Sequence, residues 1–466
     1  MRLLMKFGGT SVGDGPRIRR VVEILEPFHA QGHELAVVTS ALSGVTGQLI
    51  DMATESVRAK EKPAIEEFIE NLRTRHRAAL ETVAPDYVDE VGRILDARLA
   101  DLQAMLFGLH ILRELSPRSK DYIISFGERL SAPVVRAALR QKGVPSLVLD
   151  GCEAGLVTTG QHGDAIVLPE SEAKIRSRIL PLLPDSVPVI MGYMGCTPQG
   201  VVTTLGRSGS DYSATVIGTA IGADEVWIWT DVNGIMTTDP RLIRDARVLP
   251  SVSYLEAMEL SYFGARVMHP RSIEPAMRKN TPIRVKNSFN PSHPGTCIVR
   301  ESKRDRRVVK ALTHFTGVAL VTITGAQMIG RPGVARMIFT ALAEKEINIM
   351  MISQGSSEAN ISLLVDATQL DLAVAALSDM VKQGIVREVT SNPDVAAVAV
   401  VGAGMAGTPG ISGRIFTAMG LAGINVIMIS QGSSEVNVSF VVKESDGPKA
   451  VRVLHDEFRL SEEPDG

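Results

Sequence analysis

The octapeptide MISQGSSE occurs twice in this 466-residue chain, at residues 351–358 and again at residues 428–435. The same offset of 77 residues aligns residues 317–365 with residues 394–442, with identities in the loops, the helix and the strands. So many identities at one offset indicate an internal duplication. Each copy reads as strand, loop, helix, strand, turn and strand, the beginning of a ferredoxin-like βαββαβ unit. The repeat therefore predicts two small related units that can pack together and enclose small-molecule sites where they meet.

The part of the chain before the repeat follows a different pattern, in which short apolar runs alternate with helical segments. Residues 3–47 read as strand, glycine loop, helix around Ile18–Phe28, strand at Glu34–Thr39, and second glycine loop. This alternation predicts an α/β fold with a mostly parallel sheet covered by helices on both faces. Further strands are expected at Val144–Leu149, Val187–Met191 and Glu225–Trp229.

A helical pattern extends from about Pro63 to Leu115, and it carries a leucine stripe. The steps of three and four residues place these side chains on one helix face. We expect this face to pack in the core or against a second subunit. The stripe consists of Leu95, Leu99, Leu102, Leu106 and Leu109.

Charge and cysteine content narrow the class of partner. The formal net charge of -3 gives no electrostatic reason to expect a nucleic acid or an anionic membrane, so we expect small-molecule partners. The three cysteines, Cys152, Cys196 and Cys297, form no CxxC pair, and the sequence therefore predicts neither a disulfide framework nor a zinc site. No metal-ligating residues are assigned.

The sequence gives no targeting or membrane signal. The start, MRLLMKFGG, has too short an apolar run for the core of a signal peptide. No uninterrupted apolar run approaches the roughly 18 residues that a membrane-spanning helix needs. We therefore expect a cytoplasmic protein. The repeat extends to about His455 and a short acidic tail follows, so we expect no further fused domain.

One stretch of the second copy imitates a nucleotide-binding motif. Gly402, Gly404 and Gly407 fit GxGxxG directly after an expected strand. The first copy reads GAQMIG and lacks the middle glycine, and Ala422 stands where an acidic ribose ligand would be sought. We interpret the stretch as a loop of the repeat.

Two glycine-rich loops carry the features of an anion site. The stretch Lys6-Phe-Gly-Gly-Thr-Ser11 follows the first strand, and residues 204–214 (TLGRSGSDYSA) also precede a helical segment. Backbone N–H groups in such loops, helix N-termini and a lysine can hold phosphate or carboxylate oxygens. No GxxxxGK[ST] or protein-kinase motif is present, so phosphoryl transfer here would use another architecture. A glycine turn with an incidental lysine remains the alternative from local spacing alone.

A resemblance connects these stretches. KFGGTSV, SFGERLS, the GRSGSD loop, TDVNGIMTTDPR and FGARVMHP, in this order, resemble aspartate kinases of the amino-acid-kinase superfamily. The repeat resembles their paired ACT regulatory domains. The likeness implies an αβα sandwich kinase domain at 1–300 and ACT domains at 308–390 and 391–460, with the strand near 308–314 assignable to the second. It implies transfer of the ATP γ-phosphoryl group to the side-chain carboxylate of L-aspartate, with Mg²⁺, on the route to lysine, threonine and methionine.

The resemblance also implies roles for individual residues. Lys6 would contact the transferring phosphoryl group and Asp211 would orient nearby cations. Arg207 would bind the substrate α-carboxylate and Glu128 its α-ammonium, and Ser40, Thr46, Tyr193 and Ser210 would complete the pocket. ATP would be bound by Lys6, Phe7, Gly8, Gly9, Thr230, Asp231, Met236, Arg241, Arg266 and Val267.

Three positions depart from the family pattern. Met236 stands where many members carry Tyr, and Arg266 where many carry Lys, and these two cations are not equivalent. Ser208 replaces the commoner Gly, which restricts the backbone.

The resemblance further implies an amino-acid effector bound where ACT units meet. The SQGSSE form is similar to threonine-sensitive members, so we expect threonine, and we expect the first copy to bind it. Paired ACT domains also imply a homodimer or tetramer. For Met328 and Ile349 core packing is an equal alternative. The effector residues would be Met328, Asn348, Ile349, Gln354, Ser357 and Glu358.

Two other functions compete with this one. The chain could be a kinase of glutamate or acetylglutamate, which the choice of acceptor would reveal. It could also be an amino-acid sensor without turnover, although it retains Lys6, Glu128, Arg207 and Asp211 together.

Overall fold

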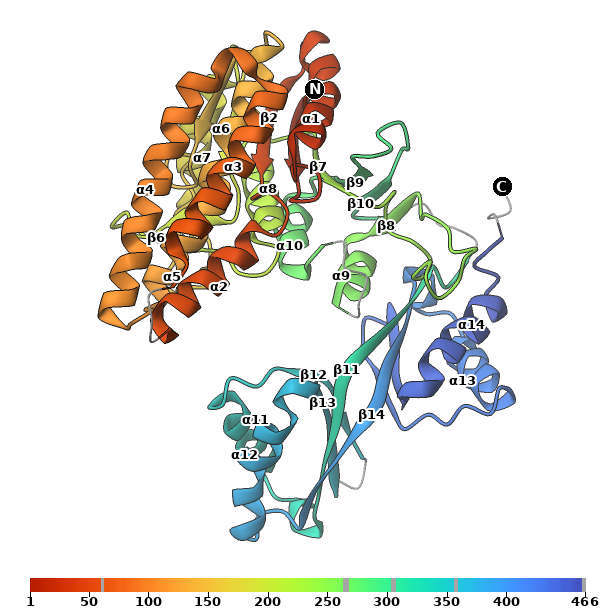
Figure 1. Ribbon diagram of the computed structural model, residues 1–466. Coiled ribbons are helices and arrows are strands. Elements are labelled where there is room, and N and C mark those ends of the chain that lie inside the picture. The colour runs from red at the N-terminus through yellow and green to blue at the C-terminus, as the bar shows by residue number, and fades with distance from the viewer. Residues whose placement is uncertain (60–62, 263–267, 303–306, 356–358, 463–466) are drawn as a thin grey trace. The chain divides into compact units, whose positions relative to one another are not determined.

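The computed structural model describes residues 1–59, 63–262, 268–302, 307–355 and 359–462 (Figure 1). The chain forms two compact units. The first comprises Met1–Ile235, Pro250–Tyr254 and Val267–Ser302, and the second comprises Met236–Leu249, Leu255–Arg266 and Lys303–Gly466.

The first unit is built on an eight-stranded sheet. Every neighbouring pair is parallel except β9 with β10, which confirms the expected mostly parallel sheet. A separate antiparallel pair is formed by β5 (Met194–Cys196) and β6 (Val202–Thr204). In spatial order the large sheet contains β3 (Ser146–Leu149), β4 (Val187–Met191), β2 (Glu34–Thr39), β1 (Arg2–Phe7), β7 (Glu225–Thr230), β9 (Ile283–Asn287), β10 (Thr296–Val299) and β8 (Ser251–Ser253).

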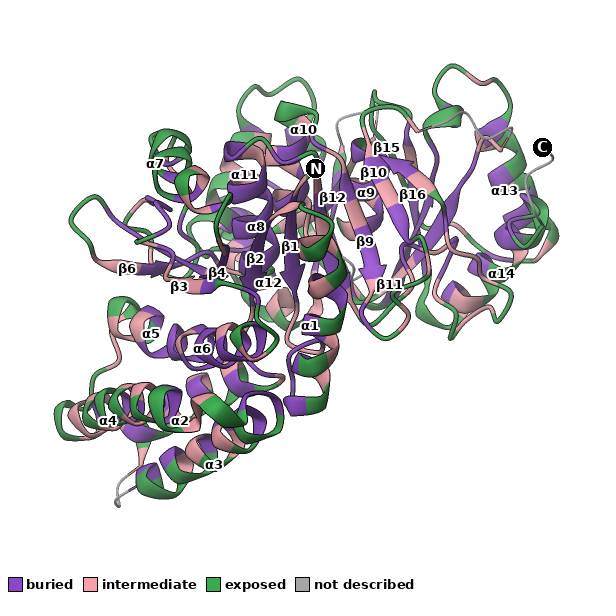
Figure 2. Cartoon of the chain, turned by 90° about the horizontal axis from the view of Figure 1, so that it is seen from above, coloured by how far each residue is buried: buried purple, intermediate pink, exposed green. Residues whose placement is uncertain are grey.

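Helices cover this sheet on both faces. Helix α6 packs against β2, β3 and β4, while α8 packs against β1, β2 and β7, and Figure 2 shows the buried strands between these two helices. The helices of the unit are α1 (Gly15–Ala30), α2 (Val45–Arg58), α3 (Ile65–Val83), α4 (Val88–Leu112), α5 (Pro117–Ile124), α6 (Phe126–Gln141), α7 (Ser171–Ile179), α8 (Gly209–Ala220) and α10 (Pro270–Lys279); α9 (Tyr254–Tyr262) begins in the first unit and continues in the second.

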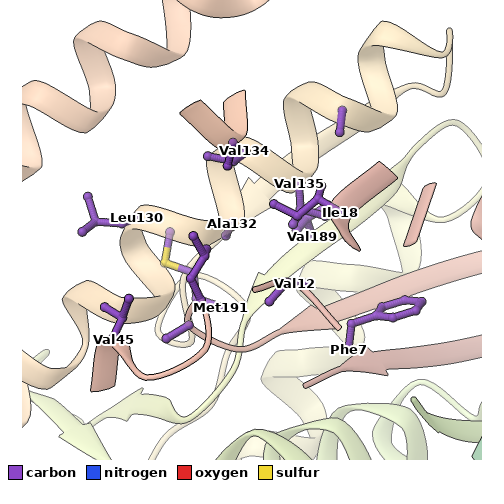
Figure 3. Close-up of a cluster of buried hydrophobic side chains, with 14 of the residues drawn as sticks. Phe7, Val12, Ile18, Val45, Leu130, Ala132, Val134, Val135, Val189 and Met191 are labelled. Atoms are coloured by element: carbon purple, nitrogen blue, oxygen red, sulfur yellow. The ribbon is translucent and has the colours of Figure 1, made fainter. Parts of the chain in front are cut away.

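The leucine stripe lies on α4 and is buried. All five leucines belong to one hydrophobic cluster with residues of α1, α2, α3 and α6, so core packing is confirmed as their role. Figure 3 shows another part of this cluster, which includes Phe7 and Val12 on either side of the first glycine loop, Leu130 of α6 and Met191 of β4. A rigid apolar core therefore supports the ends of the strands that carry the glycine loops.

The second unit contains the repeat and one antiparallel sheet of six strands. Its strand order is β12-β13-β11-β14-β16-β15. The strands are β11 (Ala311–Thr324), β12 (Ile349–Gln354), β13 (Asn360–Asp366), β14 (Glu388–Val401), β15 (Met428–Gln431) and β16 (Asn437–Lys443), and the helices are α11 (Val334–Ala343), α12 (Leu370–Lys382), α13 (Ile411–Leu421) and α14 (Gly447–Glu457).

The two repeats share their longest strands. Residues 318–324 of β11 pair with β13 of the first copy, whereas residues 311–315 pair with 397–401 of β14 in the second copy. The register shifts between these two halves of β11, where Gly317 has a positive φ of 76°. The first copy contains all four strands of its ferredoxin-like sheet, namely β12, β13, residues 318–324 of β11 and residues 388–395 of β14. The second copy takes residues 311–315 of β11 as its fourth strand, beside β14, β16 and β15, and the two sheets confirm the expected fold class.

The structure contains no membrane-spanning candidate in its described part. None of the helices there has an apolar stretch long enough to cross a bilayer.

Candidate functional site

The carboxyl ends of four neighbouring parallel strands form one edge of the large sheet. Gly8 follows β1, Ser40 follows β2 and Gly192 follows β4. Backbone hydrogen bonds hold these segments in line: the Gly8 N–H donates to the Trp229 carbonyl at 3.3 Å, and the Gly192 N–H donates to the Thr39 carbonyl at 3.0 Å. In open α/β sheets ligands bind at this edge.

Lys6 and Asp211 meet at this edge although 205 positions separate them in the sequence. The Lys6 Nζ lies 2.5 Å from Oδ1 of Asp211, and only 11% of each side chain is exposed. Lys6 comes from β1, and Asp211 from the first turn of α8. The ion pair holds the ammonium in one position, and an ammonium group has three donors, so further donors remain for an anion.

The start of α8 has an unusual backbone. Ser208, at the N-cap, has a positive φ of 53°, which a residue with a side chain adopts only at a cost. Gly209 follows, and a Cβ there would lie 2.6 Å from the Tyr193 ring. Tyr193 itself has a φ of 69°. The loop and the tyrosine therefore pack closely, which places Ser210 and Asp211 at the sheet edge.

Glu128 is the most perturbed acid of the site. It lies in the first turn of α6, its residue surface is 3% exposed, and Oε1 accepts a hydrogen bond from the Ala41 N–H at 3.0 Å. Burial raises the pKa of Glu128 to about 8, although the Ala41 N–H and the nearby charge of Lys6 act in the opposite direction. No hydrogen-bond partner for Oε2 is found in the described part of the structure. The carboxyl group thus has one free oxygen in a dry position.

Gly127 explains how α6 comes so close to the end of β2. A Cβ on Gly127 would lie 2.6 Å from the Ala41 Cβ and 3.7 Å from the Thr46 Oγ1. The Ser131 hydroxyl, one turn further along α6, donates to the Ser40 carbonyl at 2.8 Å. The structure therefore brings Ser40 and Thr46 to the same region as Glu128.

Ser210 and Arg207 complete the predicted substrate residues. Ser210 is buried, and its side chain lies so close to Gly192 that a Cβ there would be 2.9 Å from it. Arg207 is exposed, and burial together with the positive charges of Arg207 and Arg271 lowers the pKa of His269. The guanidinium of Arg207 can therefore meet a ligand from solution.

Asp121 is a structural residue of the site that the sequence patterns did not reveal. It is 1% exposed and accepts hydrogen bonds from the Thr204 N–H at 3.1 Å, the Thr204 hydroxyl at 2.5 Å, the Gly163 N–H at 3.1 Å and the His162 ring at 2.7 Å. It joins α5 to the strand that precedes the second glycine loop. Its only sequence signal is its position four residues before the SFGERLS stretch.

Ser288 joins the two predicted ATP loops. Its N–H and its hydroxyl both donate to the Thr230 carbonyl, at 2.9 and 3.1 Å, and its hydroxyl lies 2.9 Å from that of Ser11. Thr230 in turn donates to the neighbouring Asp231 carboxylate at 3.1 Å. The glycine loop after β1 and the end of β7 are thus one hydrogen-bonded assembly, and Ser288 was missed because no motif marks it.

The remaining predicted ATP residues lie elsewhere in the chain. Met236 and Arg241 belong to the second unit. Met236 pairs with Val248 in an isolated bridge, and the exposed Arg241 guanidinium is bound by Asp239 at 2.6 Å. Arg266 and Val267 lie outside the described residues.

A pocket of about 340 Å³ lies beside the first ACT copy. Its lining includes Met328, Arg331, Pro332, Gln354 and Ile361. Met328 and Gln354, two of the predicted effector residues, therefore meet there.

The other predicted effector residues do not line this pocket. Asn348 is exposed, and Ile349 packs against the hydrophobic core of the first copy, as the alternative interpretation expected. Ser357 and Glu358 lie outside the described residues.

The corresponding loop of the second copy is covered by its own chain. A Cβ on Gly402 would lie 2.2 Å from the Val308 carbonyl oxygen, so only glycine fits. Glu256, which is fully buried, accepts from the Ala403 N–H at 2.7 Å and pairs with the Lys310 ammonium at 3.2 Å. A Cβ on Gly404 would likewise lie 3.0 Å from the Val308 Cα, whereas Gly407 has a positive φ of 68°, so packing explains two of the three glycines and backbone conformation the third.

The first unit therefore contains the charged groups of a site that can bind anionic ligands. It holds a buried ammonium, an exposed guanidinium and a buried carboxyl group at the end of a parallel sheet. Within the described ranges no group of three metal-ligating side chains is found.

The chain matches two protein-family models. Residues 1–287 match the Amino acid kinase family, and residues 321–380 and 398–458 match an ACT domain. These ranges coincide with the two kinds of sheet described above.

Curated relatives match the chain over almost its whole length. Aspartokinase 1, chloroplastic, of Arabidopsis thaliana is 32% identical over 462 residues, which cover 98% of this chain and 80% of that protein. The bifunctional aspartokinase/homoserine dehydrogenase 2, chloroplastic, of the same plant is 35% identical over 468 residues, or 98% of this chain and 50% of that protein. The chain thus spans about half the length of such bifunctional relatives.

Solved structures agree in fold along almost the whole chain. Escherichia coli aspartokinase III in complex with aspartate and ADP superposes with a TM-score of 0.82 at 27% identity, covering 98% of this chain and 99% of that one. Clostridium acetobutylicum aspartate kinase gives a TM-score of 0.79 at 26% identity, with 98% and 100% coverage. The chain therefore belongs to the amino acid kinase family, among its aspartokinases with paired ACT domains.

Proposed function

We propose that the chain is an aspartate kinase, which transfers the γ-phosphoryl group of MgATP to the β-carboxylate of L-aspartate and forms 4-phospho-L-aspartate for lysine, threonine and methionine synthesis. The observation that supports this most directly is the buried Lys6–Asp211 pair near Glu128 at the carboxyl edge of the sheet. The aspartate and ADP bound to the E. coli relative support the same choice of substrates.

The reaction needs positioned positive charge more than a base. A side-chain carboxylate with an ordinary pKa of about 3.9 is already ionised at neutral pH. One of its oxygens attacks the γ-phosphorus, the bond from that phosphorus to the β,γ-bridging oxygen breaks, and ADP leaves with the electron pair. The Lys6 ammonium lowers the repulsion between the two anions, and Asp211 keeps it in place. Mg²⁺ enters as part of the MgATP substrate.

The rest of the substrate is recognised as a zwitterion. Glu128 accepts the α-ammonium, and Arg207 binds the α-carboxylate with its two-pronged guanidinium. Ser40, Thr46, Tyr193 and Ser210 complete the pocket.

For ATP we propose two groups of contacts. The glycine loop places backbone N–H groups near the phosphates, and the end of β7 holds the nucleoside. The residues are Lys6, Phe7, Gly8, Gly9, Thr230 and Asp231, together with Met236, Arg241, Arg266 and Val267.

A Lys6→Ala variant tests this assignment. In an assay of ADP release with MgATP and aspartate, we expect a loss of at least about 100-fold in rate, because a preorganised charge typically contributes that much. The matched control is Lys142→Ala, an exposed lysine at the end of α6. An unchanged Lys6→Ala rate would exclude the proposed role, and ADP release with glutamate but not aspartate would favour the other amino-acid kinases.

Binding without turnover would favour the third function. If the chain bound amino acids tightly and released no ADP under any of these conditions, it would be a sensor rather than a kinase.

We further propose that threonine inhibits the enzyme from the first ACT copy. The pocket at Met328 and Gln354 supports this copy, because the same loop of the second copy is packed against Val308 and Glu256. Inhibition should be measured with threonine, lysine and methionine, singly and in pairs. Gln354→Ala should weaken inhibition and Gln431→Ala should not. The reverse result would assign the effector site to the second copy. Inhibition by lysine but not by threonine would identify lysine as the effector.

We propose a homodimer or tetramer joined through the ACT units. The two copies of MISQGSSE bury Met351 and Met428 and expose the next residue, with Ile352 47% and Ile429 44% exposed. Exposed apolar side chains that repeat on β12 and β15 are suited to contact with a second subunit.

The domain limits and the location stay predictions. A cytoplasmic location is proposed from the sequence. The proposed limits are 1–300 for the kinase domain and 308–390 and 391–460 for the ACT domains.

A further inference from the structure

A second pocket of the first unit has no role in the proposed reaction. It measures about 300 Å³ and lies between α1 and strands β7 and β9. Its walls are the rings of Phe28, Trp227 and Trp229, and its polar lining includes Arg20 and Lys286. The volume is at the lower end of the range for small-molecule sites.

The aromatic walls form one continuous assembly. The Phe28 and Trp227 rings meet edge to face with centroids 5.1 Å apart, and the Trp227 and Trp229 centroids are 5.9 Å apart. Phe7 stacks on Trp229 with centroids 5.8 Å apart and an angle of 8° between the planes. These contacts fix the walls in place, which reduces the entropy lost when a ligand binds.

Trp229 lines the pocket, and its indole N–H is buried below the accessible surface. The residue is 1% exposed, and its indole N–H has no hydrogen-bond partner in the described part of the chain.

Lys286 supplies a buried cation. It is 8% exposed, its Nζ donates to the His293 carbonyl at 2.9 Å, and it lies 5.2 and 5.3 Å from the Trp227 and Trp229 centroids. An ammonium group has three donors, and the bond to the His293 carbonyl uses one of them. Burial and the charge of Arg284 lower the pKa of Lys286 because both destabilise its charged form. An anion beside the ammonium would stabilise that charged form.

The charges of the pocket favour an anionic ligand over a cationic one. Arg20 and Lys286 carry two positive charges, and Glu23 contributes one negative charge on the exposed side of α1. The Lys286 ammonium lies 5.2 Å from the Trp227 centroid, and the Arg20 guanidinium lies over the Phe289 ring at 5.0 Å, so cations are already present beside the aromatic rings.

The sheet separates this pocket from the Lys6–Asp211 pair. Successive side chains of a strand point to opposite faces. Phe7 pairs with Trp229 in the register of β1 and β7 and stacks on it, so Lys6 projects to the opposite face, toward α8. The pocket is therefore not a part of the phosphoryl-transfer site.

We propose that this pocket binds an aromatic carboxylate of one or two rings. The ring would stack within the walls of Phe28, Trp227 and Trp229. The carboxylate would accept hydrogen bonds from the Lys286 ammonium and the Arg20 guanidinium. Such a site would let an aromatic metabolite bind independently of aspartate and ATP.

Tryptophan fluorescence of the full chain tests the proposal, because the only two tryptophans of the sequence are Trp227 and Trp229. The probe is benzoate, with benzamide as the neutral aromatic analogue and acetate as the anion without a ring. Benzoate should cause a saturable change in tryptophan fluorescence. Its half-saturating concentration should be at least tenfold lower than that of either analogue. Saturating aspartate and MgADP should not displace it. No saturable change, equal binding of benzamide, or displacement by aspartate would overturn the proposal.

Substitutions assign the signal to the cation. Lys286→Met should weaken benzoate binding at least tenfold, Lys286→Arg should largely retain it, and the exposed-site control Lys142→Met should leave it unchanged. If Lys286→Met does not fold, Arg20→Gln on the surface of α1 replaces it and should weaken binding severalfold. Unchanged binding in the folded variant would refute the role of the cation. A Trp emission that responds to protein concentration and not to benzoate would instead identify the pocket as a protein interface, which also refutes the proposal.

Discussion

The Glu128→Gln substitution should remove most of the pH dependence of aspartate binding. In the free protein burial raises the pKa of Glu128 to about 8, while the proposed role requires its carboxylate form beside the α-ammonium. Below pH 8 part of the binding energy is therefore spent on removing a proton. The apparent affinity should rise about tenfold per pH unit up to pH 8 and then level off.

The magnitude follows from the ionised fraction. With a pKa of about 8, about one carboxyl group in ten is ionised at pH 7 and about one in a hundred at pH 6. Aspartate should thus bind about tenfold more weakly at pH 7 than above pH 8, and each binding event should release close to one proton.

Titration calorimetry in buffers of different ionisation enthalpy measures both quantities. The Glu128→Gln protein should bind more weakly at pH 8, with little proton release and a nearly flat pH profile. Glu81→Gln, an exposed acid on α3, is the matched control and should behave as the unaltered chain. A flat profile in the unaltered chain, or an unchanged slope in Glu128→Gln, would refute the reasoning.

Three other predictions concern stability and assembly. Burial lowers the pKa of His76 from 6.5 to about 4, so the unfolded chain binds this proton at a higher pH than the folded chain. The free energy of unfolding should therefore fall by about 1.4 kcal/mol per pH unit from pH 6.5 toward 4 because of this group. Urea titrations at several pH values should show that the free energy of unfolding of His76→Leu depends less on pH in this range. Ser208→Gly should raise the free energy of unfolding by about 0.5–1 kcal/mol in the same assay, because φ is 53° there, and a decrease would show that the serine is not strained. Replacing Ile352 and Ile429 together with Lys should reduce the assembly size in sedimentation velocity, whereas Leu421→Lys, also exposed on the second unit, should not; equal sizes in all three proteins would contradict the ACT interface.

Local patterns predicted the elements well where one element forms by itself. The strand at Glu34–Thr39 has the predicted limits because its apolar run is bounded by polar and glycine residues. The leucines of α4 were recognised because a helix brings residues three and four apart to one face. The repeat revealed the ferredoxin-like units since identical segments fold alike.

Pairing between distant segments was beyond the local patterns. The first strand of the first copy was expected near Gly317, yet β11 starts at Ala311 because its first half pairs with the second copy. Periodicity shows that a strand exists but not which strand lies beside it.

The same limit applies to the site. The spacing of the two glycine loops gave no distance between Lys6 and Asp211, and the family resemblance supplied the pair before the structure placed it. Asp121 and Ser288 had neither motif nor resemblance. Both act by hydrogen bonds to the backbone of distant loops, and such contacts leave no local pattern in the sequence.

The most direct test of the proposed reaction is to identify its product. The purified chain with MgATP and L-aspartate, in the presence of hydroxylamine, should release ADP and form an equal amount of hydroxamate, which mass spectrometry should locate on the β-carboxyl group. ADP release without hydroxamate, hydroxamate on the α-carboxyl group, or no product with aspartate in the folded protein would contradict the proposed function.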